Sequence, residues 1–152
     1  MNRIDNPITG GCQCGAIRYA MHVAEVEKPH VCHCRMCQRA TGGVFAALAG
    51  CSKDSLEWTR GKPAFFASSN LARRGFCQDC GTPLTFAYNL PEARIYVTIG
   101  SLDHPERASI ETQFGVESKL SWVRFCENVP GERTGEIPGS AEFFANMKTN
   151  QS

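Results

Sequence analysis

Seven of the nine cysteines lie at spacings typical of metal ligands. Three of them, Cys32, Cys34 and Cys37, fall within six residues as a C-x-C-x-x-C motif. Structural zinc usually has four protein ligands, whereas catalytic zinc usually has three and keeps one position open for water or substrate. The three neighbouring thiols therefore predict an open metal site, at which an incoming thiol would be deprotonated and held as a nucleophile.

The remaining four motif cysteines form two pairs, with 62 residues between the pairs. They are Cys12 and Cys14 in a C-x-C motif, and Cys77 and Cys80 in a C-x-x-C motif. Four thiolates complete the shell of one tetrahedral zinc, so the two pairs together predict a closed structural site. Gly15 and Gly81 follow the pairs and let the backbone adopt a positive φ beside a metal. The alternative is four buried thiols without a metal.

A closed site with a fourth protein ligand is the alternative interpretation of the three-cysteine motif. The candidate fourth ligands are Cys51, His22, His30, His33 and His104. His33 lies between two of the ligands and would have difficulty bending back onto the same metal. Cys51 lies in an apolar run and, like Cys126, is more typical of a core thiol. We therefore prefer the open site, and the spacing alone does not exclude the closed one.

Composition limits the functions that this chain can serve. The formal net charge is +1, which argues against a broad nucleic-acid-binding surface. Residues 1–7 contain no apolar secretory leader, and the longest apolar run, Val44 to Cys51, is far too short for a membrane span. We therefore expect a cytoplasmic protein without membrane contact. In a reducing compartment, such thiols favour metal over disulfides.

The pattern of the chain predicts a mainly β, antiparallel fold with short helices, stabilised by a structural zinc. Ile17, Tyr19, Met21 and Val23 alternate with other residues, as in a half-buried strand. Further strands are expected at 44–51, 54–59, 62–67, 71–77, 83–88, 94–99, 110–114 and 119–125, with a short helix as the alternative for 44–51. Short helices are expected at 34–41, before Gly42, and at 140–148, whereas 1–11 reads as an irregular lead-in and 24–30 as a turn.

The length of 152 residues is most simply one domain. We expect the motif-bearing core to occupy about residues 11–126 and a tail rich in glycine and proline to occupy 127–152. The sequence contains no repeat and no linker that would divide it. It does not predict an oligomeric state.

Three segments resemble the family of glutathione-dependent formaldehyde-activating enzymes, which is also named for centromere protein V. They are GCQCG at 11–15, CHCRMCQRATG at 32–42 and RGFCQDCGTPL at 74–84, and the resemblance extends to about Trp122. It implies a β-tent fold of antiparallel sheets. It also implies two zinc ions per chain, a structural one on Cys12, Cys14, Cys77 and Cys80 and a catalytic one on Cys32, Cys34 and Cys37.

The resemblance also implies an activity. The family is named for joining formaldehyde and glutathione into S-hydroxymethylglutathione, a carbon–sulfur lyase reaction, so the expected partner is a small thiol such as glutathione or its aldehyde adduct. Glutathione carries two carboxylates, and cations are therefore expected beside the site. Arg35, Arg39 and Arg74 are the candidates for substrate binding, with solvated surface arginine as the alternative for each.

Two other functions fit the same sequence features. One is a non-enzymatic, zinc-stabilised module of the same fold that binds a protein. The other is a redox or labile-metal site, because exposed thiolates oxidise readily. A second zinc with four protein ligands would favour the binding module, whereas reversible loss of metal from the three-cysteine site on mild oxidation would favour the redox site.

Overall fold

The computed structural model describes residues 2–124 and 127–148 and contains two β-sheets with short helices. The strands are β1 (Ile8–Gly11), β2 (Arg18–Met21), β3 (Glu27–Cys32), β4 (Ala46–Cys51), β5 (Leu56–Arg60), β6 (Ala64–Ala67), β7 (Ala72–Phe76), β8 (Pro83–Tyr88), β9 (Ile95–Thr98) and β10 (Thr112–Phe114). The α-helices are α1 (Arg35–Thr41) and α2 (Ser140–Phe144). The prediction of a mainly β fold is therefore confirmed. Among the described residues, no helix has the length and apolar character needed to cross a membrane.

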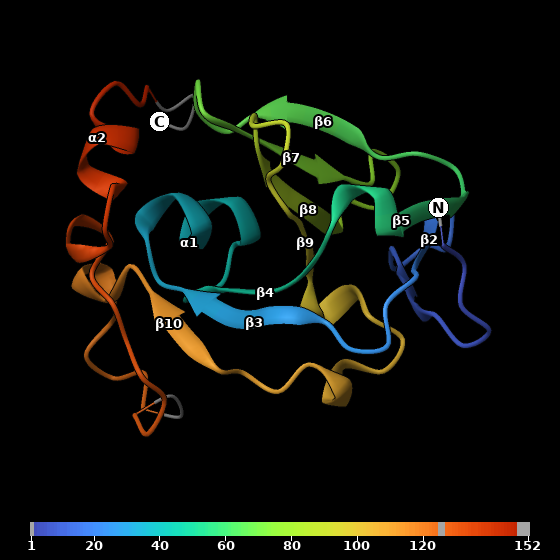
Figure 1. Cartoon of the computed structure of the whole chain (residues 1–152), viewed down its shortest axis with the longest axis horizontal. Helices are drawn as coiled ribbons and strands as arrows, with labels where there is room; N and C mark the ends of the chain where they lie inside the picture. Colours follow the sequence, from blue (N-terminus) through green and yellow to red (C-terminus); the bar gives the residue numbers. More distant parts are fainter. Residues whose placement is uncertain (1, 125–126, 149–152) are drawn as a thin grey trace.

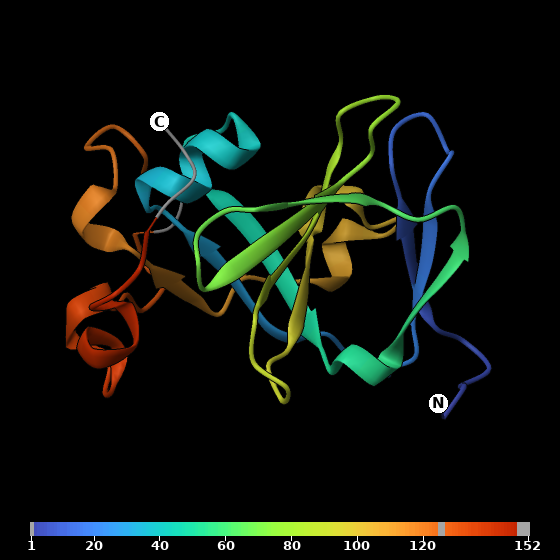
Figure 2. The same ribbon diagram turned by 90° about the horizontal axis from the view of Figure 1, so that it is seen from above.

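The smaller sheet has the strand order β1-β2-β5, and the larger one β10-β3-β4-β9-β8-β7-β6. All pairs of neighbouring strands are antiparallel except β10 and β3, which pair in parallel. Figure 1 shows β2 and β5 at one end of the long axis and α2 at the other. Figure 2, seen from above, shows the same separation of the first strands from the C-terminal segment.

The main core lies where the two sheets meet. Its fully buried side chains include Tyr19 and Met21 from β2, Leu84 from β8 and Val97 from β9. Cys51 belongs to this core, and burial raises the pKa of its thiol to about 12. The prediction of Cys51 as a core thiol is therefore confirmed, whereas Cys126 lies outside the described residues.

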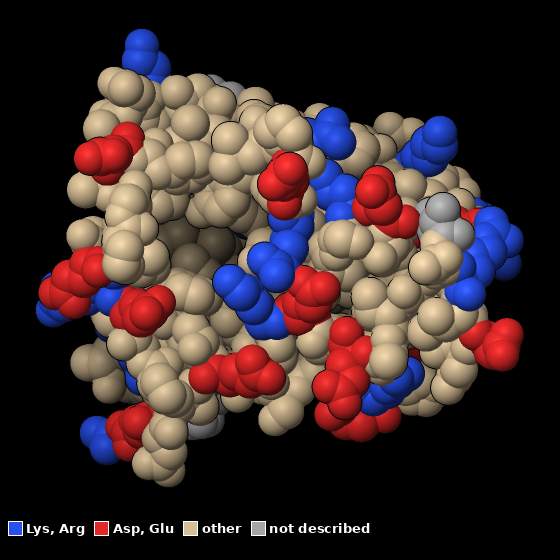
Figure 3. Space-filling model, viewed as in Figure 1, with Lys and Arg blue, Asp and Glu red and all other residues tan. Residues whose placement is uncertain are grey.

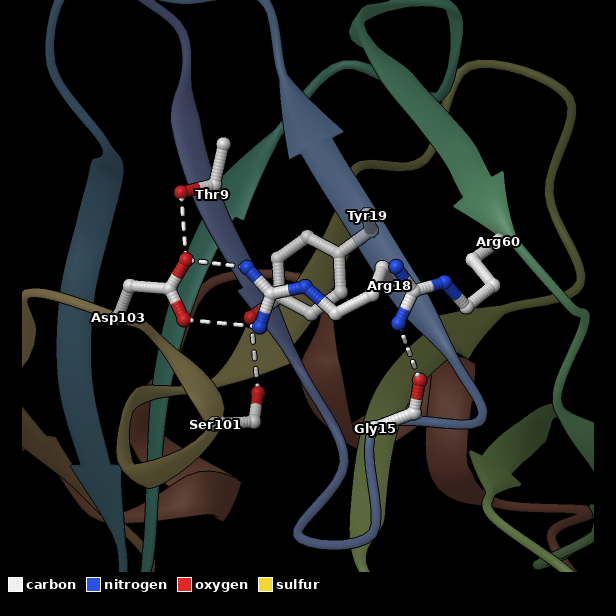
Figure 4. A network of polar contacts seen from close by, with 7 residues as sticks. All are labelled: Thr9, Gly15, Arg18, Tyr19, Arg60, Ser101 and Asp103. Carbon is white, nitrogen blue, oxygen red and sulfur yellow. Dashed lines mark hydrogen bonds and ion pairs between the residues drawn. The ribbon is translucent and has the colours of Figure 1, made fainter.

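Polar contacts connect β1 and β2 of the smaller sheet to residues 101–103 (Figure 4). The hydroxyls of Tyr19 and Ser101 are 2.8 Å apart, and Tyr19 is only 1% exposed. On the solvent side, Arg18 forms an ion pair with Asp103, which also accepts a hydrogen bond from the hydroxyl of Thr9. These contacts attach β1 and β2 to the loop after β9.

Gly10 can pack this closely against Tyr19 and Ser101 only because it has no side chain. A Cβ atom at Gly10 would lie 2.4 Å from the Tyr19 hydroxyl and 2.5 Å from the Ser101 carbonyl oxygen. We expect Gly10→Ala to cost about 2–3 kcal/mol of folding free energy, since overpacking a tight core typically costs 1–3 kcal/mol. The thermal midpoint of the zinc-loaded protein should fall by roughly 5–10 °C.

Gly100→Ala is the matched control, because no atom lies within 4 Å of the Cβ that it adds. It should leave the midpoint within about 2 °C of the unmodified protein. Equal midpoints for the two variants would contradict the close packing of Gly10 against Tyr19.

Several predicted elements differ in the structure. The lead-in contains strand β1, and most of the predicted turn at 24–30 belongs to strand β3. Residues 119–124 form turns and irregular structure instead of the predicted strand, and residue 125 lies outside the described residues. Helix α2 ends at Phe144, short of the predicted end at residue 148. Helix α1 begins one residue after its predicted start and ends at Thr41, as predicted, with Gly42 as the C-cap at a φ of 68°.

Candidate metal centres

The four paired cysteines converge between the two sheets, as their spacing predicted. Cys12 and Cys14 lie in the turn from β1 to β2, and Cys77 and Cys80 lie in the turn from β7 to β8. The ligand atoms of all four lie within 4.8 Å of one another. The described cysteines are free of disulfides. A metal at this point would join the smaller sheet to the larger one.

The spacing of these sulfurs fits zinc. A tetrahedron with Zn–S bonds of about 2.3 Å has S–S edges of about 3.8 Å. The observed distances are 3.6 Å between Cys12 Sγ and Cys14 Sγ, and 3.8 Å between Cys14 Sγ and Cys77 Sγ. Soft thiolate donors also favour zinc over harder cations. The four residues therefore fit a closed zinc shell.

The backbone of both turns is shaped around the sulfurs. Gly15 and Gly81 both have a φ of 78°, which confirms why glycine follows each pair. The Ile17 N–H donates to Cys12 Sγ over 3.2 Å. Hydrogen bonds with Thr82 lower the pKa of Cys80 to about 6. Arg60 donates to the Gly15 carbonyl oxygen over 3.0 Å and holds the first turn in place (Figure 4).

The three-cysteine motif is brought together at the start of α1. Cys32 ends β3, Cys34 is the N-cap of α1, and Cys37 lies in its first turn. Their ligand atoms lie within 4.8 Å of one another. No other His, Cys, Asp or Glu from residues 2–124 and 127–148 joins this group. The described part of the chain thus supplies three ligands, which fits an open zinc site.

The histidines and Cys51 proposed as a fourth ligand have other contacts. His30 lies edge-on between Tyr96 and Phe114, at ring distances of 5.1 and 4.9 Å. His33 is fully buried, and its Nε2 is 2.9 Å from the side-chain oxygen of Gln113. His22 pairs with Glu57, and His104 with Glu106. None of them belongs to the group formed by the three thiols.

The three thiols of this cluster shift one another's pKa values in opposite directions. Hydrogen bonds with Cys32 and Cys34, followed by the charge of Arg74, lower the pKa of Cys37 to about 3. The contacts with Cys34 and Cys37 raise the pKa of Cys32. Three close thiols cannot all ionise without a cation, because each thiolate opposes the next. This donor set therefore fits a divalent metal that would hold all three as thiolates.

Arg74 lies against this cluster in the structure. The side chain is 7% exposed, and its Nη2 donates to Cys37 Sγ over 3.4 Å. Its Nε donates to the Ser68 hydroxyl over 2.8 Å, and its guanidinium lies 4.8 Å from the ring centre of Phe86. Arg74 is thus held by protein groups on several sides. Arg35 and Arg39 are exposed on α1, and their predicted contact with substrate stays a prediction.

Two glutamines that the sequence did not mark hold the turn of the cluster in place. Gln38 donates from Nε2 to the His33 carbonyl oxygen over 2.8 Å. Gln113, on β10, contacts the His33 ring and also donates to the Val129 carbonyl oxygen over 2.9 Å. Both are almost fully buried. Local spacing does not reveal these roles, because Gln38 also donates to the Ser118 carbonyl oxygen over 3.1 Å and Gln113 contacts His33, each across 80 residues of sequence.

A cavity of about 590 Å³ opens onto the three-cysteine cluster. Cys32, Cys34, Cys37 and Arg74 lie in its wall together with apolar and aromatic residues from the larger sheet and from residues 134–147. Such a volume is typical of sites for small organic ligands. Figure 3 shows this face of the molecule hollowed on its left side, with mostly uncharged residues in the hollow. Neither Trp58 nor Trp122 lies in the wall of this cavity.

Arg74→Met should weaken zinc binding at the three-cysteine cluster about 10- to 100-fold, because partners of metal ligands commonly contribute that much. The change removes the positive charge and the hydrogen bond to Cys37. Competition with a chromogenic chelator measures the affinity of each of the two sites. Arg73→Met is the matched control, since Arg73 is exposed and its guanidinium lies over Phe65 instead. Equal affinities in both variants would argue against a role for Arg74 at this cluster.

Comparison with known proteins places these features in a family. A curated relative in Schizosaccharomyces pombe, named as an uncharacterised lyase, is 30% identical over 119 residues, covering 77% of this chain and 84% of the relative. A crystal structure of a Rhodobacter sphaeroides protein is 22% identical, and the match covers 82% of this chain and 100% of that one, with a TM-score of 0.48. The model of the family described as glutathione-dependent formaldehyde-activating enzyme matches residues 7–118, which include all seven clustered cysteines. The chain therefore belongs to the glutathione-dependent formaldehyde-activating enzyme family.

Proposed function

We propose that this protein is a zinc-dependent carbon–sulfur lyase that joins a thiol to a small aldehyde and reverses that reaction. The observation that carries the proposal is a cluster of three thiols, without a fourth described ligand, in the wall of a cavity of about 590 Å³. Family membership and the lyase name of the relative support the reaction class. Glutathione with formaldehyde is the pair for which the family is named.

The proposed reaction is an addition that balances without a redox partner. The thiol sulfur forms a bond to the aldehyde carbon, and the π electrons of the carbonyl move to its oxygen. That oxygen takes up the proton which the thiol has lost. In the reverse direction the hydroxyl loses its proton, the C–S bond breaks, and its electrons return to sulfur. A zinc held by Cys32, Cys34 and Cys37 would supply a Lewis acid that keeps an incoming thiol deprotonated.

The chain's own residues then position the reactants. Arg74 donates to Cys37, and its positive charge would offset part of the excess negative charge of three thiolates around a divalent metal. Gln38 and Gln113 fix the turn on which the cysteines lie. The aromatic residues around the cavity would give an aldehyde bound there an apolar surrounding. Neither Asp nor Glu lies in the described wall of the cavity, so the protein offers no carboxylate base there.

The second zinc has a structural role in this proposal. Cys12, Cys14, Cys77 and Cys80 would fill its coordination shell, so no position remains for substrate. The proposed content is therefore two zinc ions per chain, one structural and one catalytic.

Exchange NMR with ¹³C-formaldehyde tests the proposed activity. The zinc-loaded protein is added to formaldehyde and a panel of thiols that includes glutathione and 2-phenylethanethiol. We expect faster exchange between free formaldehyde and at least one hydroxymethyl thioether than in the same mixture without protein. Unchanged exchange with every thiol in the panel would contradict the lyase proposal.

The alternative of a binding module has one supporting observation. Phe65 and Phe66 are 42% and 39% exposed on β6, the edge strand of the larger sheet. Exposed apolar residues on an unpaired edge are a common feature of protein-binding surfaces. If no thiol is turned over and both zinc ions have four protein ligands, this alternative replaces the lyase proposal.

A further inference from the structure

The walls of the cavity at the three-cysteine cluster are lined by aromatic rings. Phe86, Tyr88 and Phe143 form a continuous series, with ring centres 5.0 Å apart from Phe86 to Tyr88 and from Tyr88 to Phe143. On another part of the wall, the His30 ring contacts Tyr96 and Phe114. Leu48 and Ala72 add buried aliphatic surface. This lining matches apolar ligand groups.

The same walls offer little to a charged ligand. Arg74 is the one Lys or Arg among the described residues of the wall, and it already bonds Ser68 and Cys37. Ser140 donates its hydroxyl hydrogen bond to the Thr134 carbonyl oxygen, and Ser69 accepts one from the Leu71 N–H. Glutathione would bring two carboxylates and an ammonium group into this cavity. Burying such charges without partners is strongly unfavourable.

One wall of the cavity comes from a segment outside the part of the chain that the family model matches. The match ends at residue 118, whereas residues 127–148, here called the C-terminal strap, contribute Ile137, Phe143, Phe144 and Met147 to the lining. The family match therefore covers the clustered cysteines but does not cover this wall.

The strap is attached firmly on two sides of the cavity. At its start, Gln113 on β10 accepts a hydrogen bond from the Glu132 N–H over 3.1 Å and donates from its own N–H to the Pro130 carbonyl oxygen over 3.0 Å. At its end, Asn70 exchanges two hydrogen bonds with the Lys148 backbone, of 2.6 and 2.9 Å. The aromatic wall is thus part of the folded structure.

We infer that the cavity takes a thiol, or thiol–aldehyde adduct, with an aromatic or branched apolar body in preference to glutathione. This inference rests on the proposed function for the sulfur end of the ligand. The rest of the ligand packs against the rings of Tyr88, Phe143 and Phe144, with its sulfur toward Cys32, Cys34 and Cys37. The volume of about 590 Å³ admits either class of thiol, so the specificity for one class depends on the residues that line the cavity.

Binding of two probes without a free thiol tests the ligand class independently of turnover. The probes are 2-phenylethanol and S-methylglutathione, and their binding to the zinc-loaded protein is measured by saturation-transfer NMR titration. We expect 2-phenylethanol to bind at least tenfold more tightly than S-methylglutathione. Tighter binding of S-methylglutathione would overturn the inference.

A pair of variants locates the binding. Phe143→Ala should weaken 2-phenylethanol binding roughly tenfold, because it removes one ring of the wall. Phe65→Ala makes the same chemical change on the exposed face of β6, outside the cavity, and should leave binding unchanged. Circular dichroism checks that both variants are folded. Equal affinities in the two variants would place the probe outside the cavity and overturn the inference.

The formaldehyde exchange measurement separates this inference from the proposed function. Faster exchange with 2-phenylethanethiol than with glutathione, by at least tenfold, supports both. Turnover of glutathione in preference to 2-phenylethanethiol supports the lyase and overturns the apolar ligand class. Binding of 2-phenylethanol in the cavity without turnover of any thiol supports the ligand class and overturns the lyase.

Discussion

Cys34→Ser should leave one zinc per chain and slow thiol–aldehyde addition by at least about 100-fold. Cys34 is one of only three described ligands at its site, and changes to the partners of metal ligands alone commonly cost 10- to 100-fold. The fold should persist, because Cys34 is partly exposed at the start of a short helix and the main core lies elsewhere. Elemental analysis gives the zinc content, and exchange NMR gives the rate.

Cys51→Ala is the matched cysteine control for this variant. Cys51 is fully buried in the main core and belongs to neither thiol cluster. The Cys51→Ala protein should keep two zinc ions and the catalytic rate of the unmodified protein. Its free energy of unfolding should fall by about 1–2 kcal/mol, because removing the sulfur leaves a space in the core. A Cys34→Ser protein that retains both zinc ions and its full rate would remove the three-cysteine cluster from the mechanism.

Cys77→Ser should lower the thermal midpoint by more than about 10 °C. Cys77 is 1% exposed in the turn between β7 and β8, and its cluster joins this turn to the turn between β1 and β2. Structural zinc contributes about 10–16 kcal/mol in small zinc-dependent peptides, which is comparable to the whole stability of a typical domain. For a protein of this size, each kcal/mol corresponds to roughly 2–4 °C.

The expected loss of stability in Cys77→Ser has an independent check in the unmodified protein. Stepwise removal of zinc with a chelator should first release the ion from the open site without loss of structure. Release of the second ion should coincide with unfolding by circular dichroism. If the two ions leave without any change in structure, the four-cysteine cluster does not stabilise the fold.

Both thiol clusters could be predicted from the sequence because their ligands come in short local motifs. A C-x-C or C-x-x-C pair followed by glycine specifies a tight turn almost by itself, and Gly15 and Gly81 adopt the positive φ that such a turn needs. Ligand counting then assigns four sulfurs to one site and three to the other. Helix α1 was predictable for the same local reasons, since Gly42 ends it.

Strand β3, which the sequence did not predict, depends on distant partners. Residues 24–30 contain Pro29 and charged residues, yet β3 forms because β4 and β10 supply hydrogen bonds on its two sides. The parallel pairing of β10 with β3 joins residues about 80 positions apart, and no local pattern encodes it. Residues 119–124 have an apolar pattern but form turns, which shows that such a pattern alone does not make a strand.

The substrate end of the site was the least predictable from sequence. Three arginines near the motifs were equivalent candidates in the sequence, and only Arg74 lies in the cavity wall, since strand β7 directs it toward Cys37. The aromatic lining combines β8, β9, β10 and the C-terminal strap. These aromatic residues belong to no sequence motif, so the ligand class follows only from their arrangement in the folded chain.

X-ray absorption at the selenium edge tests the open position most directly. The zinc-loaded protein is given 2-phenylethaneselenol under anaerobic conditions, so that the signal reports only the neighbours of the ligand's own selenium. We expect a zinc atom at bonding distance from selenium in the unmodified protein, and its loss in Cys34→Ser. Selenium with carbon as its only neighbour in the unmodified protein would show that the three-cysteine site does not accept this thiol analogue, and would contradict the account.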